Sequence, residues 1–218
     1  MTSFKRASFA LSVSDAMNED SVAERVARIS SIASVTPSLG FICVRDDAMD
    51  AGLLTAAALA ASGSELGIIL ESDDVGNLAA AASAIPCSEP ILCSQNGDQE
   101  ALATVASTLG APIILSCENL NGLMELSSTA EAGGCRDIML NPMARNMKQC
   151  LESTVAMRRL AACIPSADRP LVVRAWSGEY ALAMASVSVM RGGRLAILDD
   201  LDPQGCTVLD SLISNFSA

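Results

Sequence analysis

The chain has 218 residues, of which 50% are apolar, 18% charged and 3% aromatic, and this predicts one domain with one sizeable core. Lysine and arginine number 14 against 25 aspartates and glutamates, and the net charge of -11 disfavours nucleic acid and anionic membrane surfaces as partners. The sequence has no histidine, which removes the commonest general base, the commonest zinc ligand and every histidine-activated nucleophile.

The eight cysteines are widely spaced and form no C-x-x-C motif, so we expect free, mostly buried thiols in a reducing cytoplasm, with neither an iron-sulfur cluster nor a metal site. The N-terminal residues do not resemble a signal peptide. The longest apolar stretch, Leu53 to Ala61, falls short of the roughly 20 residues needed to cross a bilayer. The sequence therefore predicts a soluble, cytoplasmic protein.

Short apolar runs alternate with stretches of helical periodicity along the whole chain. The runs that predict buried strands are residues 7–13, 40–44, 66–70, 90–93, 111–115, 137–140, 171–174 and 195–198. After a first helix through Val22, Val26 and Ile29, the predicted helices are residues 49–62, 74–84, 98–109, 120–132, 145–163, 179–190 and 208–215. The expected helix caps are Asp73 or Asp74, Asn96 and Asn119 at the starts, and Gly63, Gly110 and Gly133 at the ends.

Eight strand-helix units favour a compact (β/α)8 TIM barrel, an α/β fold in which residues 1–218 form one domain. The alternative is an open, doubly wound sheet with the same alternation. No strand-to-helix turn carries G-x-G-x-x-G or a P-loop motif, so these turns do not predict nucleotide binding.

In a barrel, the residues just after each strand form the functional rim, and here most of them are acidic or amide residues. These side chains could hold a hard cation, or they could cap the helices that follow. The sequence has no lysine at a strand end for a Schiff base. It also lacks glycines after the eighth strand for a phosphate site, and Arg191-Gly-Gly193 lies on the opposite rim, so the sequence disfavours phosphorylated substrates.

Three arginines stand near the same rim, Arg45, Arg145 and Arg174, and they could bind a ligand carboxylate or neutralise neighbouring acids. Trp176, the single tryptophan, could stack on a planar ligand, close the barrel end or line a subunit contact. Cys43, Cys93 and Cys117 would form a thiol site if they pointed the same way, and are otherwise small core residues.

One stretch resembles a known family: Asp137-Ile-Met-Leu-Asn-Pro-Met-Ala-Arg145, followed by a helix that ends in Arg158-Arg-Leu-Ala161. Two preceding segments, Ile68-Ile-Leu-Glu-Ser72 and Glu89-Pro-Ile-Leu-Cys93, fit the same order. Together these segments resemble the barrel domain of the corrinoid iron-sulfur protein of the carbon monoxide dehydrogenase/acetyl-CoA synthase complex, over roughly Gly40 to Asp200.

The resemblance implies a TIM barrel that works beside a corrinoid (cobalamin) cofactor in one-carbon metabolism, in methyl transfer to acetyl-CoA synthase. The large subunit of that family also carries a four-cysteine cluster module and a corrinoid domain after its barrel, and this sequence matches neither. We therefore expect a barrel without an iron-sulfur cluster, with any corrinoid bound at an interface shared with a partner.

The sequence thus predicts a barrel that docks a corrinoid protein or a methyltransferase subunit, as a homodimer or heterodimer. The rim residues expected to face the cofactor or the partner are Glu71, Asn96, Asn141, Arg145 and Trp176. Two alternatives stay open: an enzyme of the methyltetrahydrofolate:corrinoid methyltransferase type that binds a pterin, and a non-catalytic structural paralogue. No catalytic residue is assigned.

Overall fold

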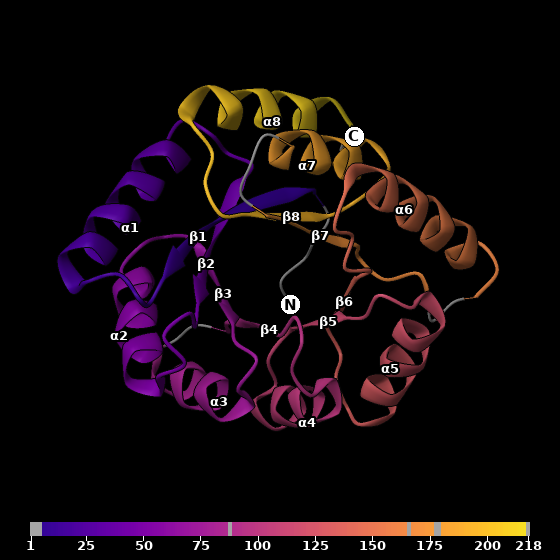
Figure 1. Cartoon of the computed structure of the whole chain (residues 1–218), viewed down its shortest axis with the longest axis horizontal. Helices are drawn as coiled ribbons and strands as arrows, with labels where there is room; N and C mark the ends of the chain where they lie inside the picture. The colour runs from indigo at the N-terminus through magenta and orange to yellow at the C-terminus, as the bar shows by residue number, and fades with distance from the viewer. Residues whose placement is uncertain (1–5, 87–88, 165–166, 177–179, 217–218) are drawn as a thin grey trace.

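A computed structural model of the chain describes residues 6–86, 89–164, 167–176 and 180–216. The described residues form eight parallel strands that alternate with eight helices in a ring (Figure 1). The strands are β1 (Ser8–Ser14), β2 (Leu39–Arg45), β3 (Gly67–Glu71), β4 (Ile91–Cys93), β5 (Ile113–Ser116), β6 (Ile138–Asn141), β7 (Val172–Ala175) and β8 (Leu195–Leu198). The helices are α1 (Glu19–Ala33), α2 (Ala51–Ser62), α3 (Val75–Ala84), α4 (Gln99–Leu109), α5 (Leu120–Ala132), α6 (Met147–Ala161), α7 (Ala181–Met190) and α8 (Pro203–Phe216).

The strands follow the order β6-β5-β4-β3-β2-β1-β8-β7, and the two end strands meet at one point. Leu140 of β6 forms a parallel bridge with Leu171, beside β7, and the Leu140 N–H donates to the Pro170 carbonyl at 2.9 Å. The ring of strands is therefore nearly closed, as the predicted (β/α)8 barrel requires, and the open doubly wound alternative is wrong.

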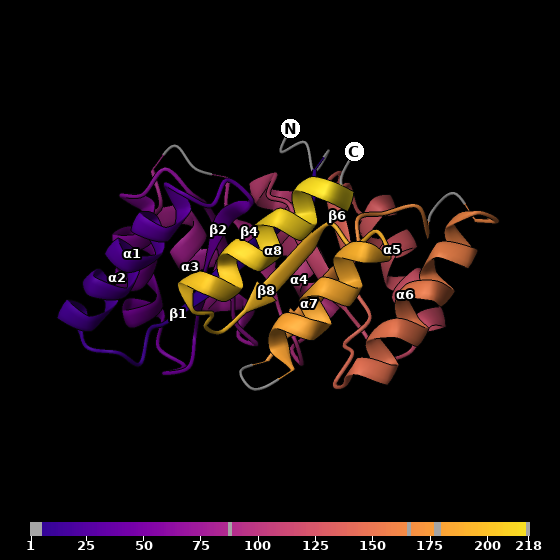
Figure 2. The same cartoon turned by 90° about the horizontal axis from the view of Figure 1, so that it is seen from above.

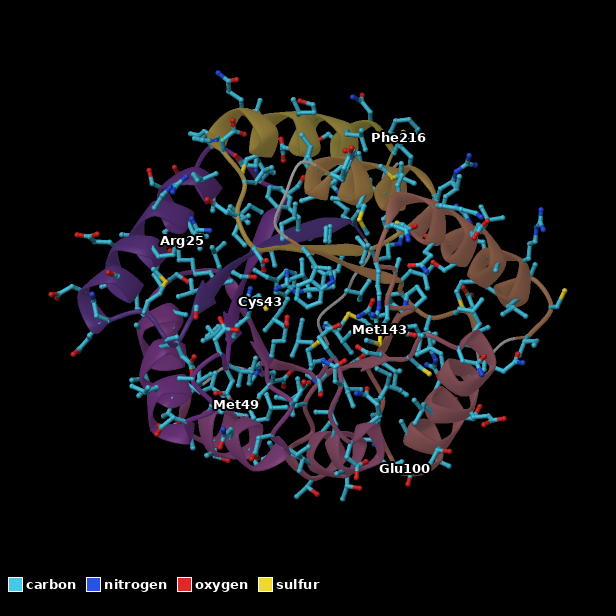
Figure 3. All side chains as sticks on the ribbon, in the orientation of Figure 1. Arg25, Cys43, Met49, Glu100, Met143 and Phe216 are labelled. Atoms are coloured by element: carbon cyan, nitrogen blue, oxygen red, sulfur yellow. The ribbon has the colours of Figure 1, made fainter. Side chains whose placement is uncertain are left out.

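Two apolar layers make up the core, because successive side chains of a strand point to opposite faces. On β1, Phe9 and Leu11 belong to the layer between strands and helices, whereas Ala10 belongs to the layer inside the barrel. Figure 3 shows Cys43 within the ring of strands. At the amino end of this interior, a Cβ on Gly67 would lie 2.5 Å from the Phe41 ring, so only glycine fits under that ring.

The helices begin and end mostly where their capping residues predict. Asp74 and Asn119 accept backbone N–H groups at the starts of α3 and α5, and Gly63, Gly110 and Gly133 follow α2, α4 and α5. The prediction for Asn96 is wrong, because Asp98 caps α4 and Asn96 lies in the preceding loop.

The last helix also starts earlier than its apolar pattern indicates. It begins at Pro203 and not at residue 208, because proline suits the first helical position and Asp202 accepts the Gly205 N–H at 2.8 Å. The predicted start of α7 at Glu179 falls outside the described residues. Helices α7 and α8 lie side by side on one side of the barrel (Figure 2).

No helix within the described ranges is both long and apolar enough to span a bilayer.

Candidate binding site at the carboxyl end of the barrel

Four charged side chains cross the carboxyl end of the barrel interior: Arg45 from β2, Glu71 from β3, Arg174 from β7 and Asp199 just after β8. The Arg174 guanidinium, with only 2% of the residue exposed, contacts Glu71 Oε2 through Nε at 3.0 Å and Asp199 Oδ1 through Nη2 at 2.5 Å. Its Nη1 donates to the Ile197 carbonyl at 3.3 Å. These four residues, which we call the mouth network, close the carboxyl end of the barrel interior.

Arg45 joins the mouth network to the rim, because its Nη1 contacts Asp199 Oδ1 at 2.7 Å and its Nη2 contacts both oxygens of Asp47. Burial raises the pKa of Glu71 above its usual value, although the positive charge of Arg174 opposes the shift. Arg174 and Glu71 are nonetheless paired with side chains only 1% and 9% exposed, so losing either partner would leave a buried charge without its ion pair.

Trp176 lies on top of the mouth network. The centre of its ring is 4.7 Å from Arg174 Cζ, a cation-π contact, and 44% of the residue is exposed. Arg174 thus supports the indole from the side of the barrel interior, and the exposed part of the ring stays open to a ligand or partner. Trp176 follows β7 by one residue, so the strand fixes its base while the arginine two residues earlier supports its ring.

A second polar group, made of amides and a hydroxyl, lies beside the mouth network. Asn141, only 1% exposed at the end of β6, donates from Nδ2 to Gln95 Oε1 and to Ser116 Oγ, each at 3.2 Å. Its Oδ1 accepts the Met143 N–H at 3.1 Å. Asn141 therefore links three consecutive strand ends and holds the loop between β6 and α6.

Two adjacent hollows open at this end of the barrel, and Trp176, Asn96 and Gln95 line both. The larger hollow, of about 340 Å³, also contacts Arg145 and Met143, and the smaller, of about 180 Å³, reaches down to Glu71. Both are at or below the small end of the usual range for small-molecule sites, so a large ligand would cover them and could not be enclosed.

Two methionines with a strained backbone flank these hollows. Met49 and Met143 have φ angles of 56° and 49°, and they are the only residues other than glycine with positive φ in the described part of the chain. Such conformations cost energy and gather at functional sites. Both lie in strand-to-helix loops at the carboxyl end, and this supports the assignment of that end as the functional face.

The loop before α4 is held by Asp73, whose carboxylate bridges two loops. Oδ1 accepts the N–H groups of Gln95, Asn96 and Gly97 at 3.0, 2.9 and 3.2 Å, and Ser94 Oγ at 2.8 Å. Partial burial alone would raise the pKa of Asp73, but these hydrogen bonds outweigh it and hold the pKa below the usual 3.8. The ionised carboxylate is thus stabilised in the folded protein.

Replacing Asp73 with alanine is expected to lower the free energy of unfolding at pH 7 by about 1–2 kcal/mol. Because the pKa is depressed in the folded state, this stabilisation is present above pH 3.8 and is lost as the pH falls through the lower folded pKa. Urea denaturation of the wild type and of Asp73→Ala at pH 7, 5 and 3.5 measures the loss. The difference between their free energies of unfolding should begin to narrow only at pH 3.5. Glu125→Ala, which removes an exposed carboxylate of α5, is the control, and an equal loss there would contradict the prediction.

Four of the five predicted site residues line the two hollows: Glu71, Asn96, Arg145 and Trp176. Asn141 lies beneath them and reaches the site through Gln95. Arg145 is exposed and paired with Glu118, and Glu71 is bound by Arg174, so the arginines neutralise acids here, as one sequence interpretation proposed. Arg174 was predicted to lie near the rim, but neither Arg174 nor Gln95 was among the five residues expected to face the ligand, although both lie at strand ends.

The structure also decides between the alternative roles predicted for the acidic rim residues and for three cysteines. Asp74 and Asn119 cap helices, which confirms the capping interpretation for these two residues. Asp50 and Asp98, which were not predicted as caps, cap α2 and α4. Cys43 and Cys93 point into the barrel interior, where burial raises the pKa of both thiols well above 9.0. Cys117 packs on the helix-facing layer instead, so the three do not form a thiol site.

Of the eight cysteines, the seven within the described residues are free. Five of them are buried and Cys163 is exposed, while Cys87 lies outside the described residues. This agrees with the expectation of mostly buried thiols.

A known family model matches most of the chain. The family model described as CO dehydrogenase/acetyl-CoA synthase delta subunit matches residues 1–201. The chain belongs to this family. The match covers the barrel from before β1 to just after β8 and agrees with the resemblance found in the sequence. No curated protein sequence matches the chain.

Solved structures with the same fold have low sequence identity. The Xanthomonas albilineans dihydropteroate synthase is 12% identical over 99% of this chain and 94% of its own, with a TM-score of 0.74. The Thermus thermophilus dihydropteroate synthase is 13% identical over 97% and 95%, with a TM-score of 0.72. The Mycobacterium tuberculosis protein Rv1207 is 16% identical over 97% and 93%, with a TM-score of 0.71. At these identities the likeness establishes the TIM-barrel fold alone.

Proposed function

We propose that this member of the delta subunit family is the barrel component of a corrinoid-dependent methyl-transfer system of the acetyl-CoA synthase type. In this proposal the carboxyl end of the barrel faces a corrinoid at an interface with a partner subunit. The observation that carries the proposal is Trp176, half-exposed and held from below by a buried arginine at the centre of that end. The family description, which names a subunit of a larger system, supports the presence of a partner.

The residues at this end fit a corrinoid that lies over the mouth and not inside it. The mouth network fills the end of the interior, and the hollows of about 340 and 180 Å³ are too small to enclose a corrin ring. The exposed indole offers a flat apolar surface. Asn96 and Arg145 are exposed and contact Asp73 and Glu118 with one side-chain nitrogen each, so their remaining polar atoms could bind amide side chains at the edge of a corrin. A bound corrinoid would supply a cobalt centre that accepts and donates the methyl group.

The partner would have to hold the corrinoid as well, because this chain has no histidine to offer as an imidazole ligand to the metal. Exposed apolar side chains lie on one side of the mouth, on the loops after β1, β2 and β7: Met17, Met49 and Tyr180, of which Tyr180 is 65% exposed. These side chains give a protein partner apolar contacts on that side of the rim. The proposal therefore assigns the rim to the partner and the centre to the cofactor.

A pterin-binding enzyme is less well supported by the geometry. A pterin would need free carboxylate and amide groups inside the pocket, but Glu71 is bound by Arg174, and the Asn141 amide is bound by Gln95, Ser116 and the Met143 N–H. These contacts would have to break before the ring could bind, at a cost of several hydrogen bonds.

Replacing Trp176 with alanine is expected to weaken cob(II)alamin binding at least tenfold, because the stacking surface is removed while the mouth network beneath it remains. The visible spectrum of the corrinoid and calorimetric titration measure binding, with and without a candidate partner subunit. Phe216→Ala is the matched control, since Phe216 is also an exposed aromatic residue but ends α8 at the opposite end of the barrel.

Two results would overturn the proposal: binding of methyltetrahydrofolate without any binding of the corrinoid, or corrinoid binding that Trp176→Ala leaves unchanged. The first result would favour the enzyme that binds a pterin. The second would move the cofactor away from the mouth.

A further inference from the structure

A third hollow, of about 500 Å³, lies at the opposite end of the barrel from the mouth. It is formed by the last turns of α6, by residues 167–171 before β7, and by Gly192 and Arg194 before β8. Its volume is within the range of small-molecule sites. The corrinoid proposal does not use this hollow.

Arginines gather at this hollow although the chain as a whole is strongly acidic. Of the 14 cationic residues, Arg158, Arg169 and Arg194 line it, and Asp168 is the one carboxylate among the described lining residues. The lining thus carries a net positive charge in a chain of net charge -11. Such a local field attracts anions.

Arg158 is held in place at the opening of this hollow. Arg158 Nη1 donates to the Arg191 carbonyl at 2.9 Å, and a Cβ on Gly192 would lie only 2.6 Å from the same Nη1. Gly192 has a φ of 89°, a conformation that side chains other than glycine rarely adopt. The guanidinium of Arg158 therefore lies directly against the glycine backbone, in a space that a larger residue would fill.

Arg169 adds a second guanidinium to this hollow, with 21% of its side chain exposed. Its Nη2 contacts Glu131 Oε1 at 2.7 Å, but its Nε is buried and has no hydrogen-bond partner within the described residues. This nitrogen is shielded from the hollow, so a ligand there would meet the exposed part of the Arg169 guanidinium. An oxyanion in the hollow would be attracted by the combined charge of Arg158, Arg169 and Arg194.

We propose that this hollow binds a phosphorylated small molecule with at least two negative charges, such as an organic diphosphate. The arginines would hold the phosphate groups, and the apolar wall made by Met157, Ala161 and Leu171 would contact the uncharged part of the ligand. This proposal departs from the sequence-based expectation against phosphorylated substrates, because that expectation considered only the turn after the eighth strand, at the other rim.

Calorimetric titration of the full chain with pyrophosphate, at 50 mM and 200 mM sodium chloride, tests the proposal. We expect binding that weakens at least tenfold in Arg169→Gln and several-fold in Arg158→Gln, and that falls with salt. Arg28→Gln is the matched control, because Arg28 is an exposed arginine on α1, near Asp200 at the other end of the barrel. It should leave the affinity unchanged.

Circular dichroism and the melting temperature without ligand show whether each variant is folded. Because Arg158 is exposed on α6, its variant keeps the test valid even if Arg169→Gln does not fold. Absence of heat with pyrophosphate at millimolar concentration would overturn the proposal, and the arginines would then be assigned to an acidic protein surface. An equal loss of affinity in Arg28→Gln would also overturn it, since binding would then reflect general charge.

Discussion

Replacing Arg174 with methionine is expected to lower the free energy of unfolding by about 3–5 kcal/mol at pH 7. The methionine fills a similar volume but leaves Glu71 and Asp199 without the cation that both contact. Glu71 suffers most, because it is buried and Arg174 is its one ion-pair partner in the described structure. Urea or thermal denaturation of the two proteins measures the loss.

The loss from Arg174→Met should depend on pH. Burial already raises the pKa of Glu71 above 4.5 in the folded protein, and removing the positive charge raises it further. A folded state that binds more protons than the unfolded chain becomes less stable as the pH rises through the folded pKa. The variant should therefore fall further below the wild type at pH 8 than at pH 5.

A second substitution separates the buried charge from simple packing. Glu71→Leu together with Arg174→Met replaces both charges by apolar groups, and this double variant should recover a large part of the stability lost in Arg174→Met. Trp176 is the single tryptophan of the chain, and its fluorescence emission depends on the contact of its ring with Arg174. The emission maximum should shift to longer wavelength in both variants. If Arg174→Met were as stable as the wild type at pH 8, the mouth network would not be the closed ion-pair system described above.

Replacing Asn141 with alanine is expected to lower the free energy of unfolding by about 2–3 kcal/mol, the second largest effect. The change removes the partner of Gln95 Oε1, of Ser116 Oγ and of the Met143 N–H, all in a buried region. Without the last contact, the strained loop that carries Met143 and Arg145 loses a support. We therefore also expect weaker corrinoid binding in this variant.

Asn215→Ala is the control for Asn141→Ala, because the Asn215 amide is exposed on α8 and, within the described residues, donates to a carbonyl of its own helix alone. Chemical denaturation should show less than about 0.5 kcal/mol for the control. The double variant Asn141→Leu with Gln95→Met should lower the free energy of unfolding by less than the sum of the two single changes. In the double variant both amides are replaced, so neither one is left in the core without its partner. Strict additivity would mean that the two amides do not interact.

The pattern of the sequence determined the order of strands and helices, because buried parallel strands need short apolar runs and their crossover helices need apolar residues at helical spacing. The eight predicted strands agree with the structure to within one or two residues at nearly every boundary. Local capping chemistry also set most helix starts, for example at Asp74 and Asn119. The start of α8 was missed because its first turn has no apolar pattern and is fixed by Asp202 and Pro203.

The sequence also identified the functional rim, because parallel strands in a barrel all end at the same face. It could not tell that Glu71 and Arg174, separated by 103 positions along the chain, meet across the interior. That contact depends on barrel closure and on which face of each strand turns inward, and both follow from packing over the whole fold.

The sequence by itself therefore determined the repeating strand-helix architecture, the family and the end of the barrel where the candidate site lies. Only the tertiary structure decided that Arg174 pairs with buried acids and holds Trp176 at the surface. It alone brought the arginines of α6 and of the segments before β7 and β8 around one hollow. The physical reason is that local pattern fixes the elements, whereas distant side chains meet only when strands close into a ring and helices pack around them.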